Sequence, residues 1–239
     1  MDFTKFNAHE LYSQFITAEP YNHIVIDNFI EPTYLRKLLE EVKGYKQIMD
    51  EDYQRIEHEY EVQTKKIGLS DTERMGPISK DFFEQSQSPE MIAFLEKITG
   101  IPDLLPDPML YGGGIHRTTT GGKLGIHADF NLHPYTQKHR RINILLYLNE
   151  DWKPEYKGEL ELWQKDMNKC IKSISPILNR AVIFRITDYA FHGHPIPWQG
   201  DDNHPRLSIA LYYYTDDRPE DEKSDPHMAI WKMRFNSFF

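Results

Sequence analysis

Residues 123–130 read KLGIHADF, a short run in which apolar and polar side chains alternate. Successive side chains of a β-strand point to opposite faces, so His127 and Asp129 are predicted to emerge together while the apolar residues between them face the other way. An imidazole and a carboxylate would then share one small region of space. Taken alone, such a pair is more often a surface pair than half of a metal site, which needs a third ligand from elsewhere in the chain.

Similar short runs surround this stretch from residue 109 onward, and turn residues separate them. They read MLYGGGIHRT, RINILLYLN, ELELWQ, AVIFRI and RLSIALYYYT. Many short strands separated by Gly, Pro, Asn and Asp are typical of a β-sandwich or jelly roll rather than of alternating strands and helices. We therefore predict a mainly β (α+β) fold whose jelly-roll core spans residues 108–215.

The first 107 residues are predicted to support this core with helices packed on one side. A β-branched strand at 23–27 precedes an amphipathic helix that ends near Gly44, and a second helix is capped by Ser88 and ends at Gly100. Residues 50–66 are rich in charge, which indicates a solvated helix or a mobile segment.

The chain length and charge restrict the class of protein. A chain of 239 residues is long enough for one well-buried core, so a single domain is expected. The acidic tail at 216–239 is predicted to be a solvated connection rather than a binding arm, although Trp231, Met233 and Phe235 could return its end to the body.

Composition also argues against several kinds of partner. The formal charge is −9, and the only cluster of cationic side chains is at 138–141, so neither a nucleic acid nor an anionic membrane surface is expected. No signal pattern and no membrane-length apolar run is present, and the single Cys170 excludes an intramolecular disulfide. These features predict a soluble cytoplasmic protein.

A third metal ligand is available in YAFHGHP, residues 189–195, directly after the strand-like AVIFRI. Either His192 or His194 could complete a set of two histidines and one carboxylate, which occupies one face of an octahedral iron and leaves three positions open. Spacing alone does not separate the two histidines. The glycine between them gives the backbone room beside a crowded site.

The run RLSIALYYYT adds a site for an acidic ligand. Leu207 and the alternate residues after it form an apolar face, whereas Arg206, Ser208 and Ala210 share the opposite face. A planar guanidinium, a hydroxyl donor and a small neighbour suit a carboxylate. The alternative is an exposed arginine on an edge strand.

Assembled in chain order, these motifs resemble the iron(II)/2-oxoglutarate-dependent oxygenases of the prolyl-4-hydroxylase-like superfamily. The similarity is greatest to bacterial and phage members with an HADFN-type first motif and a later HGHP followed by Arg-x-Ser. It spans roughly residues 110–214 and includes RINILLYLNEDW and GELELW. The resemblance implies a double-stranded β-helix (jelly-roll) core.

By this resemblance, His127, Asp129 and His192 are the catalytic residues and the iron ligands. His192 is assigned because it occupies the first histidine position of HGHP. His194 would face the substrate or support the metal site, and it remains the alternative ligand.

The resemblance also assigns the co-substrate contacts. Arg206 would pair with the distal carboxylate of 2-oxoglutarate and Ser208 would donate to the same group, with Tyr111 and Asn143 as further contacts. The implied cofactor and co-substrates are Fe(II), 2-oxoglutarate and O₂, with ascorbate as a candidate stimulant.

The implied reaction is hydroxylation of an unactivated C–H bond, coupled to conversion of 2-oxoglutarate to succinate and CO₂. Asp129 favours this outcome, because in related halogenases a small residue replaces the carboxylate. The expected substrate is a proline, a prolyl residue or another amino-acid-type molecule, either small or peptidyl.

Candidate wall residues of the substrate pocket are His116, Arg117, Trp163, His194 and Trp198. The glycine-rich residues 112–122 could move over the site. Packing is the alternative for each aromatic residue, and it is favoured for Trp163, which follows an alternating strand.

Two other functions remain open. A cupin-type metalloenzyme could hold zinc or manganese on the same ligands, but Arg206 and Ser208 would then have no task. A catalytically silent jelly-roll protein that binds 2-oxoglutarate or another small molecule is the second, and the intact ligand set counts against it.

Overall fold

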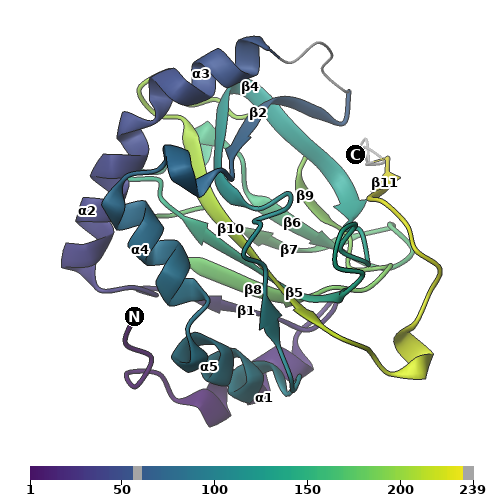
Figure 1. The fold of residues 1–239 in the computed structure, drawn as a ribbon. Helices are drawn as coiled ribbons and strands as arrows, with labels where there is room; N and C mark the ends of the chain where they lie inside the picture. The colour runs from purple at the N-terminus through teal and green to yellow at the C-terminus, as the bar shows by residue number, and fades with distance from the viewer. Residues whose placement is uncertain (56–60, 234–239) are drawn as a thin grey trace.

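A single strongly curled antiparallel sheet forms most of the molecule (Figure 1). The structure is a computed structural model that describes residues 1–55 and 61–233. Phe235 and part of the 50–66 segment lie outside these ranges. The strands are β1 His23–Ile26, β2 Gln63–Leu69, β3 Leu105–Pro106, β4 Gly114–Ala128, β5 His139–Tyr147, β6 Leu160–Trp163, β7 Cys170–Ile174, β8 Ala181–Arg185, β9 His192–His194, β10 Arg206–Thr215 and β11 Ile230–Lys232.

The strand order is β1-β8-β5-β10-β4-β9-β6-β7, with β2 and β11 paired to β4 and β3 paired to β10. Strand β4 therefore meets four different neighbours along its length. Because its partners change from β10 to β9 midway, the sheet curls around it. The predicted mainly β jelly-roll architecture is confirmed.

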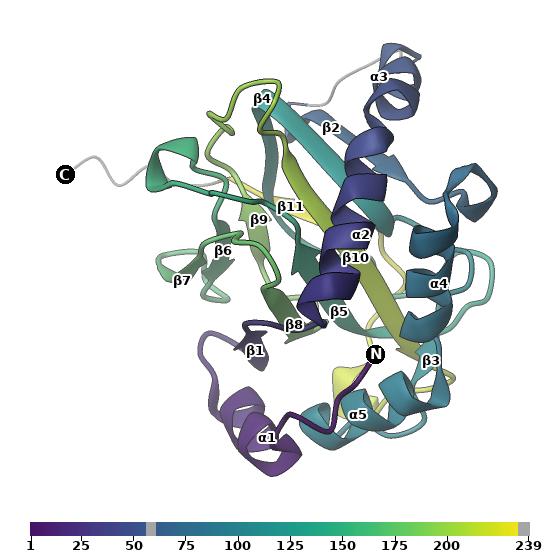
Figure 2. The same cartoon turned by 90° about the vertical axis from the view of Figure 1, so that its left-hand side faces the viewer.

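The helices gather on one side of this sheet, as predicted (Figure 2). They are α1 Ala8–Thr17, α2 Pro32–Gly44, α3 Lys46–Gln54, α4 Pro77–Ser86 and α5 Pro89–Thr99. The caps read from the sequence are present: the Ser88 hydroxyl accepts a 3.2 Å hydrogen bond from the Met91 amide, and Gly100 ends α5 with φ 70°. The sequence predicted α2 and α5 but not α1 or α4.

The strands β5, β8 and β10 separate the apolar core from the interior of the curl. Alternate side chains such as Ile144, Ile183 and Ile209 pack into the core beneath the helices. Their neighbours Asn143 and Ser208 face the other way and line a cavity. The two-faced pattern predicted for RLSIALYYYT is therefore confirmed, and it places every polar residue of that face inside the curl.

The glycine-rich stretch before His127 is not a loop. Residues Gly114–Ala128 form one continuous strand where the sequence predicted two, and β10 and β2 flank its first half. Residues 115–118 have sheet partners on both sides, which argues against movement of this part of residues 112–122 as a lid.

The 50–66 segment is only partly helical. Helix α3 ends at Gln54, and β2 begins at Gln63 and runs antiparallel to β4. This strand was missed by the sequence prediction. In the described part of the chain, none of the helices is both long and apolar enough to cross a membrane.

The acidic tail does return to the body. Glu222 contacts Arg141 and Arg185, and β11 then pairs with the end of β4 so that Trp231 lies opposite His127. The predicted return of the tail's end is therefore confirmed for Trp231, while most residues of 216–229 are exposed, as expected of a solvated connection.

Candidate functional site

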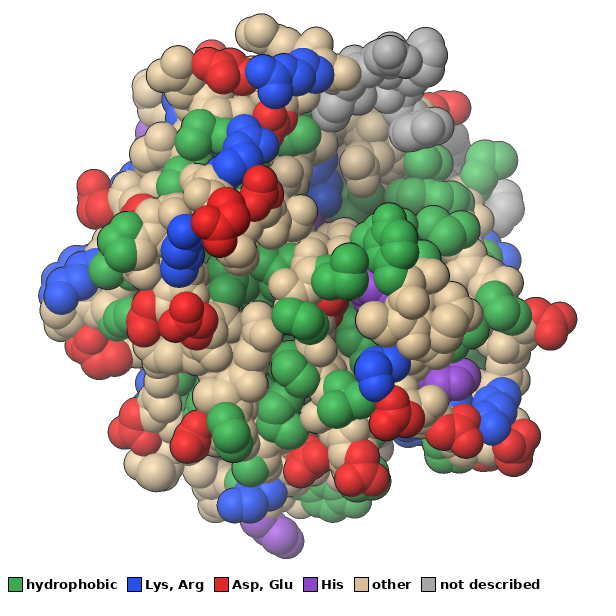
Figure 3. Space-filling view, in the orientation of Figure 1, with side chains coloured by type: hydrophobic (Ala, Val, Ile, Leu, Met, Phe, Trp, Pro, Cys, Tyr) green, Lys and Arg blue, Asp and Glu red, His purple; other side chains and the backbone are tan. Residues whose placement is uncertain are grey.

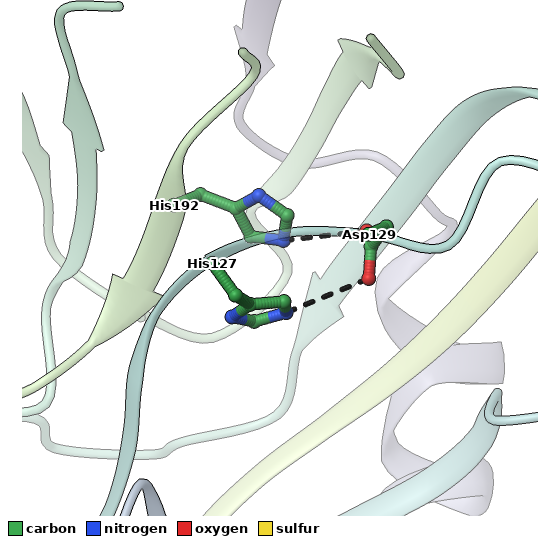
Figure 4. Close-up of side chains that lie close together, drawn as sticks. All are labelled: His127, Asp129 and His192. Carbon is green, nitrogen blue, oxygen red and sulfur yellow. Dashed lines mark ion pairs between the residues drawn. The ribbon is translucent and has the colours of Figure 1, made fainter. Parts of the chain in front are cut away.

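Three side chains converge where β9 meets the end of β4 (Figure 4). His127 and His192 are paired residues of the two strands, and Asp129 follows β4 directly. Nε2 of each imidazole lies 3.5 Å from a different carboxylate oxygen of Asp129. The three ligand atoms all lie within 4.8 Å of one another, which is the spacing of groups that can share one metal ion.

Hydrogen bonds fix both imidazoles in the orientation that metal binding requires. Nδ1 of His127 lies 2.9 Å from the Gly125 carbonyl oxygen, and Nδ1 of His192 lies 2.9 Å from that of Ala190. Since a carbonyl oxygen only accepts, each Nδ1 must carry the proton, which leaves the Nε2 lone pair free. Burial lowers the pKa of His192 to about 4, so this ring is neutral at neutral pH.

Gly193 allows the two strands to approach this closely. A Cβ atom at position 193 would collide with the backbone carbonyls of Leu124 and Gly125 on β4. A side chain there would push β9 away and separate His192 from His127. The glycine in HGHP is thus required by the backbone contact.

Asp129 is held by two neighbours on β5. Its Oδ2 accepts a 2.6 Å hydrogen bond from Asn143 Nδ2 and lies 3.2 Å from a guanidinium nitrogen of Arg140. Burial raises the pKa of the Asp129 carboxyl, but the charge of Arg140, with smaller effects of the neighbouring imidazoles, outweighs it and holds the pKa far below its usual range. Asp129 is therefore ionised, with Oδ1 on the side facing His127.

Asn143, predicted to contact the co-substrate, uses both ends of its amide for hydrogen bonds within the protein. Its amide oxygen accepts a 2.9 Å hydrogen bond from Arg140 Nε while its nitrogen donates to Asp129. It lines the cavity, but its polar atoms are directed to the carboxylate.

The triad opens into a cavity of about 200 Å³ that Arg206 and Ser208 also line. Arg206 is 4% exposed, and its Nε donates a 2.8 Å hydrogen bond to the Gly158 carbonyl. Burial lowers its pKa, and no carboxylate among residues 1–55 and 61–233 lies within ion-pair distance. A buried guanidinium without a counter-ion fits an acidic ligand.

Tyr147 lies beside the Arg206 guanidinium. Ser208 pairs with it across the sheet, and its ring centroid lies 5.1 Å from the Arg206 guanidinium carbon. Its hydroxyl is buried and makes no hydrogen bond with any residue the structure describes. Buried hydroxyls are normally satisfied, so an oxygen-rich ligand beside Arg206 would supply the missing partner. The triad therefore fits a metal ion, and the group of Arg206, Ser208 and Tyr147 fits the co-substrate.

Two of the predicted wall residues do face the cavity. His116 and His194 line it, and both are more than 90% buried. Burial lowers the pKa of each far below its usual value, so both imidazoles are neutral. Among the described residues His194 does not belong to the three-ligand cluster, which contains His192 instead.

The other predicted residues lie elsewhere. Arg117 points to the opposite face of β4 and pairs with Asp50, because adjacent strand residues alternate. Trp163 packs with Phe191, and Trp198 is fully buried and lines a different cavity from that of the triad.

Tyr111 is also outside the cavity. Its ring packs against those of Phe130 and His133, with centroids 5.6 and 5.5 Å away. The contact between Tyr111 and the co-substrate stays a prediction.

The cavity or site residues missed by sequence reasoning include Lys66, Arg140, Tyr147 and Trp231. Tyr147 could have been found, because it lies four residues after Asn143 and shares its face of the strand. Trp231 reaches the cavity only through the pairing of β11 with β4, and its ring centroid lies 4.7 Å from that of His127.

Comparison with known proteins agrees with this geometry. Residues 113–214 match the model of the 2OG-Fe(II) oxygenase superfamily, whereas no curated protein sequence matches the chain significantly. That match contains the triad, Tyr147, Arg206 and Ser208.

Solved structures share the fold at low sequence identity. A Pseudomonas putida prolyl-4-hydroxylase is 14% identical, with 87% of this chain and 98% of that chain covered and a TM-score of 0.58. A Trichoplax adhaerens prolyl hydroxylase, solved with a hypoxia inducible factor peptide fragment, is 17% identical over 87% and 89% of the chains, with a TM-score of 0.59.

A third structure contains the ligands that this fold accommodates. HygX from Streptomyces hygroscopicus, solved with nickel, 2-oxoglutarate and hygromycin B, is 12% identical over 94% and 97% of the chains, with a TM-score of 0.54. The chain is thus similar to the 2OG-Fe(II) oxygenase superfamily over residues 113–214, and it shares the fold of the solved prolyl hydroxylases.

Proposed function

We propose that the protein is an Fe(II)- and 2-oxoglutarate-dependent dioxygenase that hydroxylates an unactivated C–H bond of a proline, a prolyl residue or another amino-acid-type substrate. The observation that carries this proposal is the convergence of His127, Asp129 and His192 in the same cavity as Arg206, a buried cation without a counter-ion among the described residues.

In this proposal the chain holds iron through Nε2 of His127, Nε2 of His192 and one oxygen of Asp129. Three protein ligands on one side leave three positions for co-substrates. When bound, Fe(II) supplies the oxidation in which 2-oxoglutarate, O₂ and a C–H bond become succinate, CO₂ and an alcohol. Asn143 and Arg140 secure Oδ2 of Asp129, so Oδ1 stays directed to the site.

The distal carboxylate of 2-oxoglutarate is assigned to Arg206, Ser208 and Tyr147. The guanidinium supplies charge, and the two hydroxyls supply donors from adjacent paired positions of β10 and β5. Anchoring this end also positions the other end of the molecule at the triad, since both line one cavity of about 200 Å³.

The substrate class is supported by the neighbours that are named prolyl hydroxylases. HygX, which was solved with hygromycin B, indicates that the same fold also accepts other molecules. Residues of the substrate wall in this proposal are His116, His194 and Trp231 rather than Arg117, Trp163 or Trp198.

The test is succinate formation from 2-oxoglutarate, measured with and without Fe(II) and O₂ across a panel of free amino acids and proline-containing peptides. We expect turnover that requires both Fe(II) and O₂, that one substrate class stimulates, and that Arg206→Met reduces through a higher KM for 2-oxoglutarate. Binding of 2-oxoglutarate without turnover would support the silent binding protein. Zinc- or manganese-dependent conversion of a substrate without 2-oxoglutarate consumption would support the cupin-type enzyme.

A further inference from the structure

Strand β2 brings a second cation into the cavity. Lys66 pairs with Thr118 of β4, and Thr118 pairs with Arg206 of β10, so the three form one row across the sheet. Paired residues of antiparallel strands have their side chains on the same face. Both Lys66 and Arg206 accordingly line the cavity that contains the triad.

The ammonium of Lys66 has no protein partner in the described ranges. No hydrogen bond or ion pair joins it to any residue of 1–55 or 61–233, whereas the adjacent Lys65 turns outward and donates to the Thr120 carbonyl at 3.0 Å. Desolvation in the cavity, with a smaller effect of Arg206, lowers the pKa of Lys66 to about 8. A cation held in this way is unfavourable unless an anion joins it.

The metal and 2-oxoglutarate do not supply that anion. The two charges of Fe(II) are offset by Asp129 and by the carboxylate of 2-oxoglutarate at the metal, and the distal carboxylate offsets Arg206. Arg140 is already fixed on Asp129 and stacked on Phe130 and Tyr212, with its guanidinium carbon 4.4 and 3.5 Å from their ring centroids. Arg140 is thus engaged by protein groups and Arg206 by the proposed co-substrate, whereas Lys66 contacts neither among the described residues.

The surroundings of Lys66 suit a small substrate. The space-filling view shows cationic and histidine surfaces at the base of a hollow, with apolar side chains gathered beside it (Figure 3). Gln63 of β2 and Trp231 of β11 line the same cavity of about 200 Å³. His194 adds an imidazole whose two nitrogens are buried without a hydrogen-bond partner among the described residues.

We propose that Lys66 binds the free carboxylate of the substrate, so that the preferred substrate is a small amino acid with a free α-carboxylate rather than a residue within a peptide. This inference rests on the proposed function. It favours free amino acids over peptidyl substrates, because neither Fe(II) nor 2-oxoglutarate is expected to pair with the charge of Lys66. His194 is then placed to hydrogen-bond the amino or imino group of the same molecule.

The experiment uses the Fe(II)-loaded protein with 2-oxoglutarate and compares each free L-amino acid, proline included, with its C-terminal amide and with proline-containing peptides. Two readouts are taken. The first is succinate formation in air. The second is the change that each compound causes in the weak visible absorption band expected when 2-oxoglutarate binds the protein-bound Fe(II) without O₂, here called the anaerobic band. We expect at least one free acid to be active and its amide to be weaker by about tenfold or more, the typical effect of a charge-assisted hydrogen bond.

Variants separate this role from co-substrate binding. Lys66→Met should raise the KM for the amino acid about tenfold or more, remove the preference for acid over amide, and leave the Kd for 2-oxoglutarate within about twofold. Lys66→Arg should restore part of the preference. The matched control is Lys65→Met, which removes the same charge outside the cavity and should change neither constant.

Three outcomes would overturn the inference. The first is that amides or peptides are as active as the free amino acids. The second is that Lys66→Met changes only the Kd for 2-oxoglutarate. The third is that no free amino acid responds in either readout although the anaerobic band forms. Absence of the band in the parent protein would instead contradict the proposed function itself, so the two failures are distinguishable.

Discussion

Asn143 donates a 2.6 Å hydrogen bond to Oδ2 of Asp129 from β5, a strand that contributes no ligand to the triad. The same amide accepts from Arg140, so one side of the carboxylate is occupied by the Asn143 donor and by the charged guanidinium. A ligand fixed on one oxygen presents the other to a metal in a single orientation.

Replacing Asn143 by leucine should therefore weaken Fe(II) binding. Loss of such a supporting hydrogen bond typically costs about 10- to 100-fold in metal affinity. Anaerobic Fe(II) titration measures the metal affinity. The control is Asn168→Leu, at an exposed position. An unchanged Fe(II) affinity in Asn143→Leu would show that the hydrogen bond does not position Asp129.

Tyr147 and Tyr213 offer a matched pair of hydroxyl deletions. The Tyr147 hydroxyl is buried without a partner among the described residues, so Tyr147→Phe should leave the unfolding free energy of the unliganded protein unchanged or higher. It should raise the Kd for 2-oxoglutarate about tenfold.

The Tyr213 hydroxyl instead donates to the Ser86 carbonyl at 2.7 Å. Tyr213→Phe should lower the unfolding free energy by about 1 kcal/mol and leave the Kd for 2-oxoglutarate unchanged. Urea unfolding and 2-oxoglutarate titration test both variants, and a reversed pattern would remove Tyr147 from the co-substrate site.

The metal-free protein should become less stable as the pH falls from neutral. Burial lowers the pKa of His192 to about 4, whereas an unfolded histidine has a pKa of 6.5. Between these values the unfolded chain binds a proton that the folded chain does not, so the unfolding free energy decreases with decreasing pH.

For His192 alone, the expected loss between pH 7.5 and pH 5 is about 2 kcal/mol. The buried neutral rings of His116 and His194 act in the same direction. Urea unfolding of the metal-free protein measures the loss, which should be smaller in His192→Gln. A flat profile over this range would contradict the buried neutral state.

Glu222 should stabilise the tail that leads to β11. Its carboxylate lies 3.3 Å from a guanidinium nitrogen of Arg141 and also contacts Arg185 and Arg218. Glu222→Gln would leave three arginines without that charge and should lower the unfolding free energy by about 2 kcal/mol. The exposed Glu220 is the control, and an equal effect of Glu220→Gln would show that the arginine contacts do not stabilise the tail.

The shared faces of His127 with Asp129 and of Arg206 with Ser208 could be predicted from the sequence, because successive side chains of a strand alternate between its two faces. The pair His127 and Asp129 lies on one strand end, and Arg206 and Ser208 share one face of β10, as period-two patterns predict. The same rule, applied to adjacent residues, would have excluded Arg117 from the cavity that His116 lines.

Lys66 and Trp231 were not accessible in this way. Each reaches the cavity through the pairing of a distant segment with β4, and neither segment has an alternating apolar pattern. Their burial is decided by contacts between residues far apart in the chain, which charge and periodicity within a short window do not encode.

The most direct test of the account is anaerobic absorption spectroscopy of the protein with Fe(II) and 2-oxoglutarate. A weak visible band should develop when 2-oxoglutarate chelates the protein-bound iron. The band should be absent in His127→Ala and present in the control His204→Ala, an exposed histidine remote from the triad. No band in the parent protein, or a band that survives His127→Ala, would contradict the assignment of His127, Asp129 and His192 as the iron site.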